Sequence, residues 1–237
     1  MPELMKALIL GLVEGATEFL PVSSTGHQII VGDLLNFTGE RAKTFEIFIQ
    51  LGAILAVIGY YRAKIGHVLA TLGSEAASRR MIANLFVAFL PAAVLGLAFS
   101  KAIKAHLFNP VTVAAALIVG GFVIMAIEAR KRRPTITSTD EISGRTALAI
   151  GIAQCFALVP GTSRSGATIM GALLCGLSRP AAAEFSFFLA IPTMFAATLY
   201  SLYKARDVLS VADLPTFGVG IVAAFVASPM TPLHPAL

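Results

Sequence analysis

Two glutamates stand four residues apart in an otherwise apolar stretch near the start of the chain. At that spacing Glu14 and Glu18 share one face of a helix. Two ionised carboxylates in apolar surroundings need a cation, a proton or a positive side chain beside them. Such oxygen ligands suit Mg²⁺ or Ca²⁺, which would bridge both carboxylates to the oxygens of a phosphate. The pair predicts a metal-binding or acid–base role; the alternative is that Glu18 only faces water at a helix end.

A cluster of hydroxyls and one imidazole follows the carboxylates directly. Pro21 interrupts the apolar stretch, and Ser23, Ser24, Thr25 and His27 come next. A hydroxyl near a base is the minimum requirement for nucleophilic or general acid–base catalysis. Ser24 could therefore attack a substrate, or His27 could activate water. In the alternative interpretation the hydroxyls cap a new helix and His27 forms a local hydrogen bond.

A loop rich in glycine and hydroxyls precedes another apolar segment in the second half of the chain. It consists of Gly161, Thr162, Ser163, Arg164, Ser165 and Gly166. Backbone N–H groups at a helix start favour an anion, and Arg164 can bind a phosphate through two parallel hydrogen bonds. The loop therefore predicts a phosphate site. A transporter of an anionic substrate could use the same geometry, whereas a purely structural break would not require an arginine.

The composition indicates what surrounds these residues. Of the 237 residues, 57% are hydrophobic and 13% are charged, and the mean hydropathy is +0.82. These values exclude a soluble single domain and predict an all-α polytopic membrane protein. Four apolar stretches, 45–61, 81–100, 111–127 and 181–203, are the predicted transmembrane helices. The net charge of +5 lies mostly in the loops between them, so we expect no nucleic-acid partner.

Two further apolar stretches break in the middle. Residues 5–20 run into the first polar cluster and 146–159 run into the second, and each is followed by a short apolar segment, 29–37 or 168–177. Each half is too short to cross a bilayer, which predicts two re-entrant broken-helix pairs. The stretches also resemble each other at an offset of about 140 residues, where Glu14 aligns with Gln154 and Pro21 with Pro160.

The basic residues predict the orientation. The loops 62–80 and 130–145 carry four and five Lys or Arg residues, so both should face the cytoplasm. The first broken pair then enters from outside and the second from the cytoplasm. This predicts an inverted-topology repeat within one membrane domain spanning 1–237, with repeats at about 1–128 and 145–228. The tips of the two broken pairs would meet near the midplane.

Two segments also resemble a known family. Residues 14–27 (EGATEFLPVSSTGH) and 160–168 (PGTSRSGAT) are similar to the signature segments of the undecaprenyl-diphosphate phosphatases, also called bacitracin resistance proteins. The resemblance implies hydrolysis of undecaprenyl diphosphate to the monophosphate and phosphate, which recycles the lipid carrier for cell-wall synthesis. It also implies a multi-pass protein of the bacterial cytoplasmic membrane, with its active site open to the outer face. A secondary transporter of an anionic substrate is the alternative.

The resemblance also implies roles for individual residues. Glu14, Glu18, Ser24 and His27 would be catalytic, and the two glutamates would hold Mg²⁺ or Ca²⁺. The substrate would be bound by Ser23, Thr25, Gly161, Thr162, Ser163, Arg164, Ser165, Gly166 and Thr168. The expected partners are the isoprenoid lipid diphosphate, the surrounding membrane lipids and, as one assembly, a second copy in a homodimer.

The end of the chain departs from the family pattern. Family members continue through further apolar helix after residues 214–227, whereas the last ten residues here contain Pro229, Pro232 and Pro235. A segment with three prolines cannot form a membrane helix. We therefore interpret 229–237 as an atypical proline-rich tail that arises from truncation or an altered reading frame.

Overall fold

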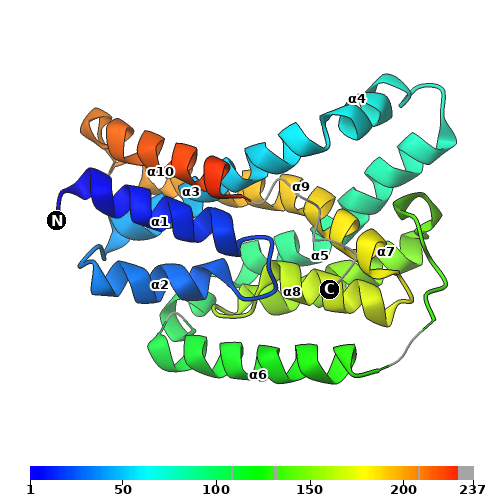
Figure 1. Ribbon diagram of the computed structural model, residues 1–237, viewed down its shortest axis with the longest axis horizontal. Helices are drawn as coiled ribbons and strands as arrows, with labels where there is room; N and C mark the ends of the chain where they lie inside the picture. The colour runs from blue at the N-terminus through cyan, green and yellow to red at the C-terminus, as the bar shows by residue number, and fades with distance from the viewer. Residues whose placement is uncertain (108, 131–132, 208, 229–237) are drawn as a thin grey trace.

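The computed structural model describes residues 1–107, 109–130, 133–207 and 209–228, and these ranges are mostly helical (Figure 1). Apart from one isolated bridge between Ile136 and Leu177, they contain no β-structure. The helices are α1 (Glu3–Thr17), α2 (Ser24–Leu34), α3 (Glu40–Tyr60), α4 (Arg62–Ala70), α5 (Ala76–His106), α6 (Pro110–Glu128), α7 (Gly144–Gln154), α8 (Arg164–Leu174), α9 (Arg179–Ala205) and α10 (Leu214–Ala227), with short 3₁₀ turns η1 (Thr139–Glu141), η2 (Cys155–Leu158) and η3 (Val211–Asp213).

Four of these helices, α3, α5, α6 and α9, are long and apolar enough to cross a membrane. They correspond to the four predicted spans, and the all-α membrane class is confirmed at this level. Helix α6 buries almost none of its surface, and its side chains Ile118 and Phe122 are 61% and 64% exposed. A helix that is apolar all round and unburied in the chain is suited to face lipid.

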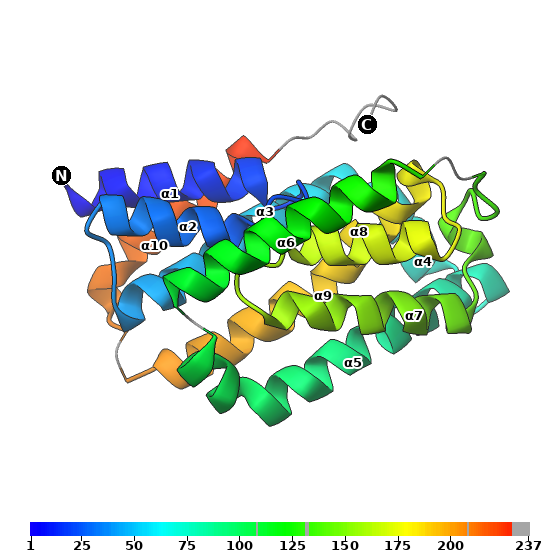
Figure 2. The same ribbon diagram turned by 90° about the horizontal axis from the view of Figure 1, so that it is seen from below.

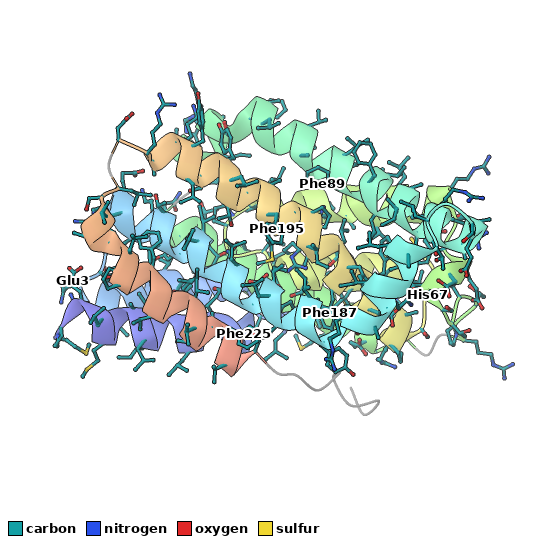
Figure 3. All side chains as sticks on the ribbon, turned by 90° about the horizontal axis from the view of Figure 1, so that it is seen from above. Glu3, His67, Phe89, Phe187, Phe195 and Phe225 are labelled. Atoms are coloured by element: carbon teal, nitrogen blue, oxygen red, sulfur yellow. The ribbon has the colours of Figure 1, made fainter. Side chains whose placement is uncertain are left out.

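One predicted loop is largely helical. Residues 62–80 contain α4 and the start of α5, because this segment is rich in Ala, Leu, Lys and Arg, which are good helix formers. The two predicted basic loops nevertheless meet: Lys64 Nζ donates to Glu184 Oε1 at 2.5 Å and to Thr139 Oγ1 at 2.8 Å. His67 on α4 lies at the opposite end of the molecule from Glu3 (Figure 3). Residues 131–132 and the predicted tail 229–237 lie outside the described residues.

Both predicted helix breaks are present, between α1 and α2 and between α7 and α8. Figure 2 shows the two helix pairs pointing toward each other from opposite ends of the molecule. Their tips are joined, because Ser165 Oγ donates to the carbonyl oxygens of Glu18 (3.2 Å) and Leu20 (2.9 Å). The membrane orientation of the two halves, the repeat boundaries and the inverted repeat stay predictions.

Helix α10, which is not among the predicted spans, packs along α1 and α3. Its close approach depends on glycines, since a Cβ at Gly11 would lie 2.5 Å from the carbonyl oxygen of Gly220. Gly15 and Gly52 likewise meet backbone atoms of α10. Small residues four apart on one helix allow such close helix packing in membranes. Helix α10 therefore covers the back of the helix that carries Glu14.

Each broken pair has its own apolar support. Around α1, the fully buried Leu10, Phe45 and Ile49 pack with Phe217 of α10. Around α7 and α8, a larger cluster includes Ile150 and Phe185. These clusters fix the helices from which the two polar tips project, so the tips meet in a defined position.

Candidate active site

A cavity of about 180 Å³ lies where the two tips meet. Seven of the predicted site residues line it, namely Glu18, Ser23, Ser24, Thr25, Thr162, Ser163 and Arg164. Three further polar residues line it from the span helices and α7, namely Gln50, Gln154 and Thr193. The tertiary structure therefore brings the two predicted polar clusters into one cavity, although they are about 140 residues apart in the sequence.

Glu18 joins the two clusters. One of its carboxylate oxygens, Oε1, accepts a hydrogen bond from Arg164 Nη2 at 2.7 Å, and the other, Oε2, accepts one from the Ser24 hydroxyl. The ion pair is mostly buried, with 13% of the arginine side chain and 7% of the glutamate side chain exposed. The positive side chain that the buried carboxylate requires is thus Arg164. The interpretation of Glu18 as a residue that only faces water is not supported by this burial.

The Arg164 guanidinium keeps hydrogen-bonding capacity for a ligand. Besides Glu18, it donates from Nη1 to the carbonyl oxygen of Ser186 at 3.1 Å and from Nη2 to Met194 Sδ at 3.2 Å. Its buried Nε has no hydrogen-bond partner among the described residues. A thioether is a weak acceptor, and a phosphate oxygen would be a much stronger one. The geometry is therefore suited to exchange weak contacts for an anion while Glu18 remains paired.

Glu14 lies behind Glu18, fully buried, and does not line the cavity. Its Oε2 accepts a hydrogen bond from Gln28 Nε2 at 3.2 Å, and the same nitrogen donates to the Leu10 carbonyl oxygen at 2.8 Å. Glu14 Oε1 and Gln28 Oε1 are both buried without a hydrogen-bond partner in the described chain. Two carboxylates and an amide oxygen, with unsatisfied lone pairs, fit the donor chemistry of a hard divalent cation. No group of three or more His, Cys, Asp or Glu side chains is found among the described residues.

Several predicted site residues hold the backbone of the site and do not line the cavity. His27 Nδ1 donates to the Ser23 carbonyl oxygen at 2.9 Å, which is the local hydrogen bond of the alternative interpretation. Thr168 Oγ1 is fully buried and lies 2.6 Å from Ser186 Oγ. Gly161 adopts a positive φ of 94°, and Gly166 donates its N–H to the cap Ser163. The structure therefore gives these residues positioning contacts, and the catalytic role of His27 stays a prediction.

The backbone at Ser23 is strained. Its φ is +62°, a left-handed conformation that non-glycine residues rarely adopt, and it caps α2 by accepting the Gly26 N–H at 3.3 Å. Strained backbone of this kind costs about 1–3 kcal/mol and is concentrated at functional sites. The strain at Ser23 fixes the direction in which the next residue, Ser24, enters α2.

Five polar residues near the site were not predicted. They are Gln28, Gln50, Gln154, Ser186 and Thr193. Each is a polar residue inside an apolar helix, where burial is costly, and this is the same signal that the glutamates carry. Sequence reasoning could have found them by that signal, although not which of them face the cavity.

Comparison with known proteins shows the family of this chain. Residues 7–231 match the family described as Bacitracin resistance protein BacA. An undecaprenyl-diphosphatase of Dechloromonas aromatica is 62% identical over 225 residues, which are 95% of this chain and 82% of that protein. Proteins of the same name from Aromatoleum aromaticum and Nitrosospira multiformis are 58% and 57% identical over 96% and 95% of this chain, and over 83% and 82% of their own length. The chain therefore belongs to the bacitracin resistance protein BacA family.

Proposed function

We propose that this chain hydrolyses undecaprenyl diphosphate to undecaprenyl phosphate and inorganic phosphate, and so recycles the lipid carrier for cell-wall synthesis. The names of its relatives support this reaction. The observation that carries the proposal is the hydrogen-bonded chain Arg164–Glu18–Ser24 at a cavity among helices that can span a membrane. It combines a cation for phosphate, a hydroxyl and a carboxylate within one site.

In the route we favour, Ser24 is the nucleophile. Its Oγ attacks the terminal phosphorus, the bond from that phosphorus to the bridging oxygen breaks, and the lipid monophosphate leaves. Glu18 already accepts the Ser24 hydroxyl hydrogen bond and can take its proton. Water then hydrolyses the phosphoserine and releases inorganic phosphate. The second route is direct attack by water activated by His27, in which Ser24 only positions the phosphate.

Arg164 binds the phosphate under attack in either route. Its guanidinium replaces the contact with Met194 by bonds to phosphate oxygens, which opposes the negative charge that accumulates in the transition state. Ser163 and Thr162 line the same part of the cavity and can donate hydroxyl hydrogen bonds to the phosphate. The substrate itself would enter from the surrounding membrane lipids, with the cavity open to the outer face of the cytoplasmic membrane.

We infer that Glu14 and Glu18, with the amide oxygen of Gln28, hold Mg²⁺ or Ca²⁺. The orphaned oxygens of Glu14 and Gln28 support this ligand set. When bound, the cation supplies positive charge to the diphosphate oxygens. Glu14→Gln and Glu18→Gln should each weaken the metal requirement of phosphate release, since each removes charge but keeps shape. An unchanged Mg²⁺ or Ca²⁺ requirement in both variants would point to another ligand set.

The reaction is tested with the purified protein in detergent. Phosphate release from the lipid diphosphate should stop with EDTA and return with added Mg²⁺ or Ca²⁺. No release from folded protein at saturating metal would contradict the proposed hydrolysis, and it would favour a secondary transporter of an anionic substrate.

Acid-quench trapping separates the two routes. With substrate labelled by ³²P in the terminal phosphate, label should appear on the wild-type protein and be absent from Ser24→Ala. No label at any quench time, together with measurable turnover of Ser24→Ala, would exclude the covalent route.

A further inference from the structure

Gln50 is a polar residue at the middle of the span helix α3. Its side chain lines the cavity, and it makes no hydrogen bond to any residue that the structure describes. Gln50 is half-buried, whereas the two other glutamines near the site, Gln28 and Gln154, are buried and differ in this respect. Gln28 donates to the Leu10 carbonyl oxygen and Gln154 to the Ala88 carbonyl oxygen, so both join helices. Polar residues within membrane spans are costly, and they commonly face a cavity where they can bind a ligand.

The charges on the cavity wall are confined to one pair. Glu18 and Arg164 are the only charged residues among its described lining residues, and they are bonded to each other at the helix tips. Away from the tips, the polar lining residues are Gln50, Gln154 and Thr193. Thr193 Oγ1 donates to Gln154 Oε1 at 3.3 Å, so this pair is partly satisfied. Gln50 is therefore the residue of this wall whose amide hydrogens are both free.

A diphosphate presents two phosphate groups, joined by a single oxygen. If one is held by Arg164 beside Ser24, the other must be bound by neighbouring donors in the same cavity. We propose that Gln50 is a substrate-binding residue whose amide donates to the phosphate that stays on the lipid. This inference rests on the proposed function. A neutral donor suits that position, since it releases the lipid monophosphate more readily than a second cation would.

The proposal is tested by Gln50→Leu, which removes the donor at similar size. We expect the KM for the lipid diphosphate to rise about tenfold, the ratio that corresponds to about 1.4 kcal/mol. Inhibition by farnesyl phosphate should weaken by a similar factor, whereas inhibition by inorganic phosphate, which binds at Arg164, should stay unchanged. The Tm in detergent should not fall, because Gln50 has no hydrogen bond to lose. Gln50→Glu keeps the shape but adds a negative charge, and it should weaken farnesyl phosphate binding further.

Thr198→Val is the matched control. Thr198 Oγ1 is buried and donates to the Ile47 carbonyl oxygen at 3.2 Å, which joins α9 to α3, and it does not line the cavity. This variant should lower the Tm and leave the KM and both inhibition constants unchanged. The two variants therefore separate loss of a structural bond from loss of a ligand contact.

Three results would overturn the inference. The first is a Gln50→Leu variant with wild-type KM and wild-type inhibition by farnesyl phosphate. The second is weaker inhibition by inorganic phosphate alone, which would place Gln50 at the other phosphate. The third is a lower Tm without a change in KM, as expected for Thr198→Val. If the wild type releases no phosphate, the proposed hydrolysis is wrong, but the role of Gln50 in binding can still be tested. The rise in Tm that farnesyl phosphate causes would then be compared between Gln50→Leu and the wild type.

Discussion

The two helix breaks share a serine cap, but they differ in backbone conformation and in chemistry, since φ is +62° at Ser23 and −63° at Ser163. Ser23 caps α2 by accepting the Gly26 N–H, and Ser163 caps α8 by accepting the Gly166 N–H, at an offset of 140 residues. The next residue is Ser24 in the first break and Arg164 in the second. The same kind of cap therefore precedes a hydroxyl beside carboxylates in the first break and a cation in the second. The difference shows how two similarly capped helix breaks can form one asymmetric site.

The helices that precede the breaks differ in the same way. Gly11 of α1 allows the approach of α10, and Gly151 of α7 allows the approach of α5, where a Cβ would lie 2.5 Å from the Ala88 carbonyl oxygen. Three residues further on, α1 carries Glu14 and α7 carries Gln154. Packing is thus maintained in both halves, whereas the ionisable group is present in only one. A second carboxylate in α7 would have no arginine beside it, because the arginine already pairs with Glu18.

If the two broken-helix pairs, α1–α2 and α7–α8, have inverted topology, they enter the membrane from opposite sides. The expected difference in labelling is all or none. In a background without Cys155 and Cys175, single cysteines at Asp33 and Arg179 should react with a membrane-impermeant maleimide from opposite sides. Both positions are exposed. Right-side-out and inside-out vesicles provide the measurement, with each as the control for the other. Labelling of both cysteines from the same side would contradict the predicted inverted topology.

Arg164→Lys should have the largest effect on turnover. A lysine cannot bond Glu18 and the Ser186 carbonyl oxygen together and still present a planar fork to phosphate. We expect turnover to fall about 100-fold, which is about 2.7 kcal/mol of barrier. Phosphate release by protein shown to be inserted and folded is the measurement. Turnover within about threefold of wild type, under about 0.7 kcal/mol, would make Arg164 a structural link between the tips.

Gln154→Glu gives α7 a carboxylate at the position that aligns with Glu14 in the sequence, and this change should weaken substrate binding. The new carboxylate cannot donate to the Ala88 carbonyl oxygen, and it would place a negative charge on the wall of a phosphate cavity. We expect the KM to rise about tenfold, or about 1.4 kcal/mol. Gln154→Met, which loses the same hydrogen bond without adding charge, is the control. Equal KM values for the two variants would show that charge at this position does not matter.

The smallest expected effect is the difference in stability between variants of the two helix caps, Ser23 and Ser163. Ser163→Ala should lower the stability by about 1 kcal/mol, the usual loss for a helix cap. Ser23→Gly should be close to neutral, because glycine tolerates the φ of +62° and the relief of strain offsets the lost cap. The Tm in detergent measures both variants, with Ser23→Ala as the control that loses the cap but keeps the strain. A larger drop for Ser23→Gly than for Ser23→Ala would contradict the strain.

The sequence predicted the elements because their signals are local. The four spans follow from apolar length, and both breaks follow from proline, glycine and hydroxyls after a short apolar run. Helix α10 was not predicted because its 14 residues are too few to cross a membrane alone. Its position depends on glycines in two other helices, α1 and α3. Helix α4 escaped because charge patterning indicates a side of the membrane and not a conformation.

By itself, the sequence also determined which residue types would form the site, since charges inside apolar helices need partners wherever the chain folds. Only the tertiary structure decided the partners. It paired Glu18 with Arg164 across 146 residues, placed Glu14 behind the cavity with Gln28, and turned His27 to the Ser23 carbonyl. It also brought Gln50 to the cavity from the middle of a span. Contacts between distant segments depend on how the helices pack. The spacing of residues within one helix shows which of them share a face, but not which other helix that face will contact.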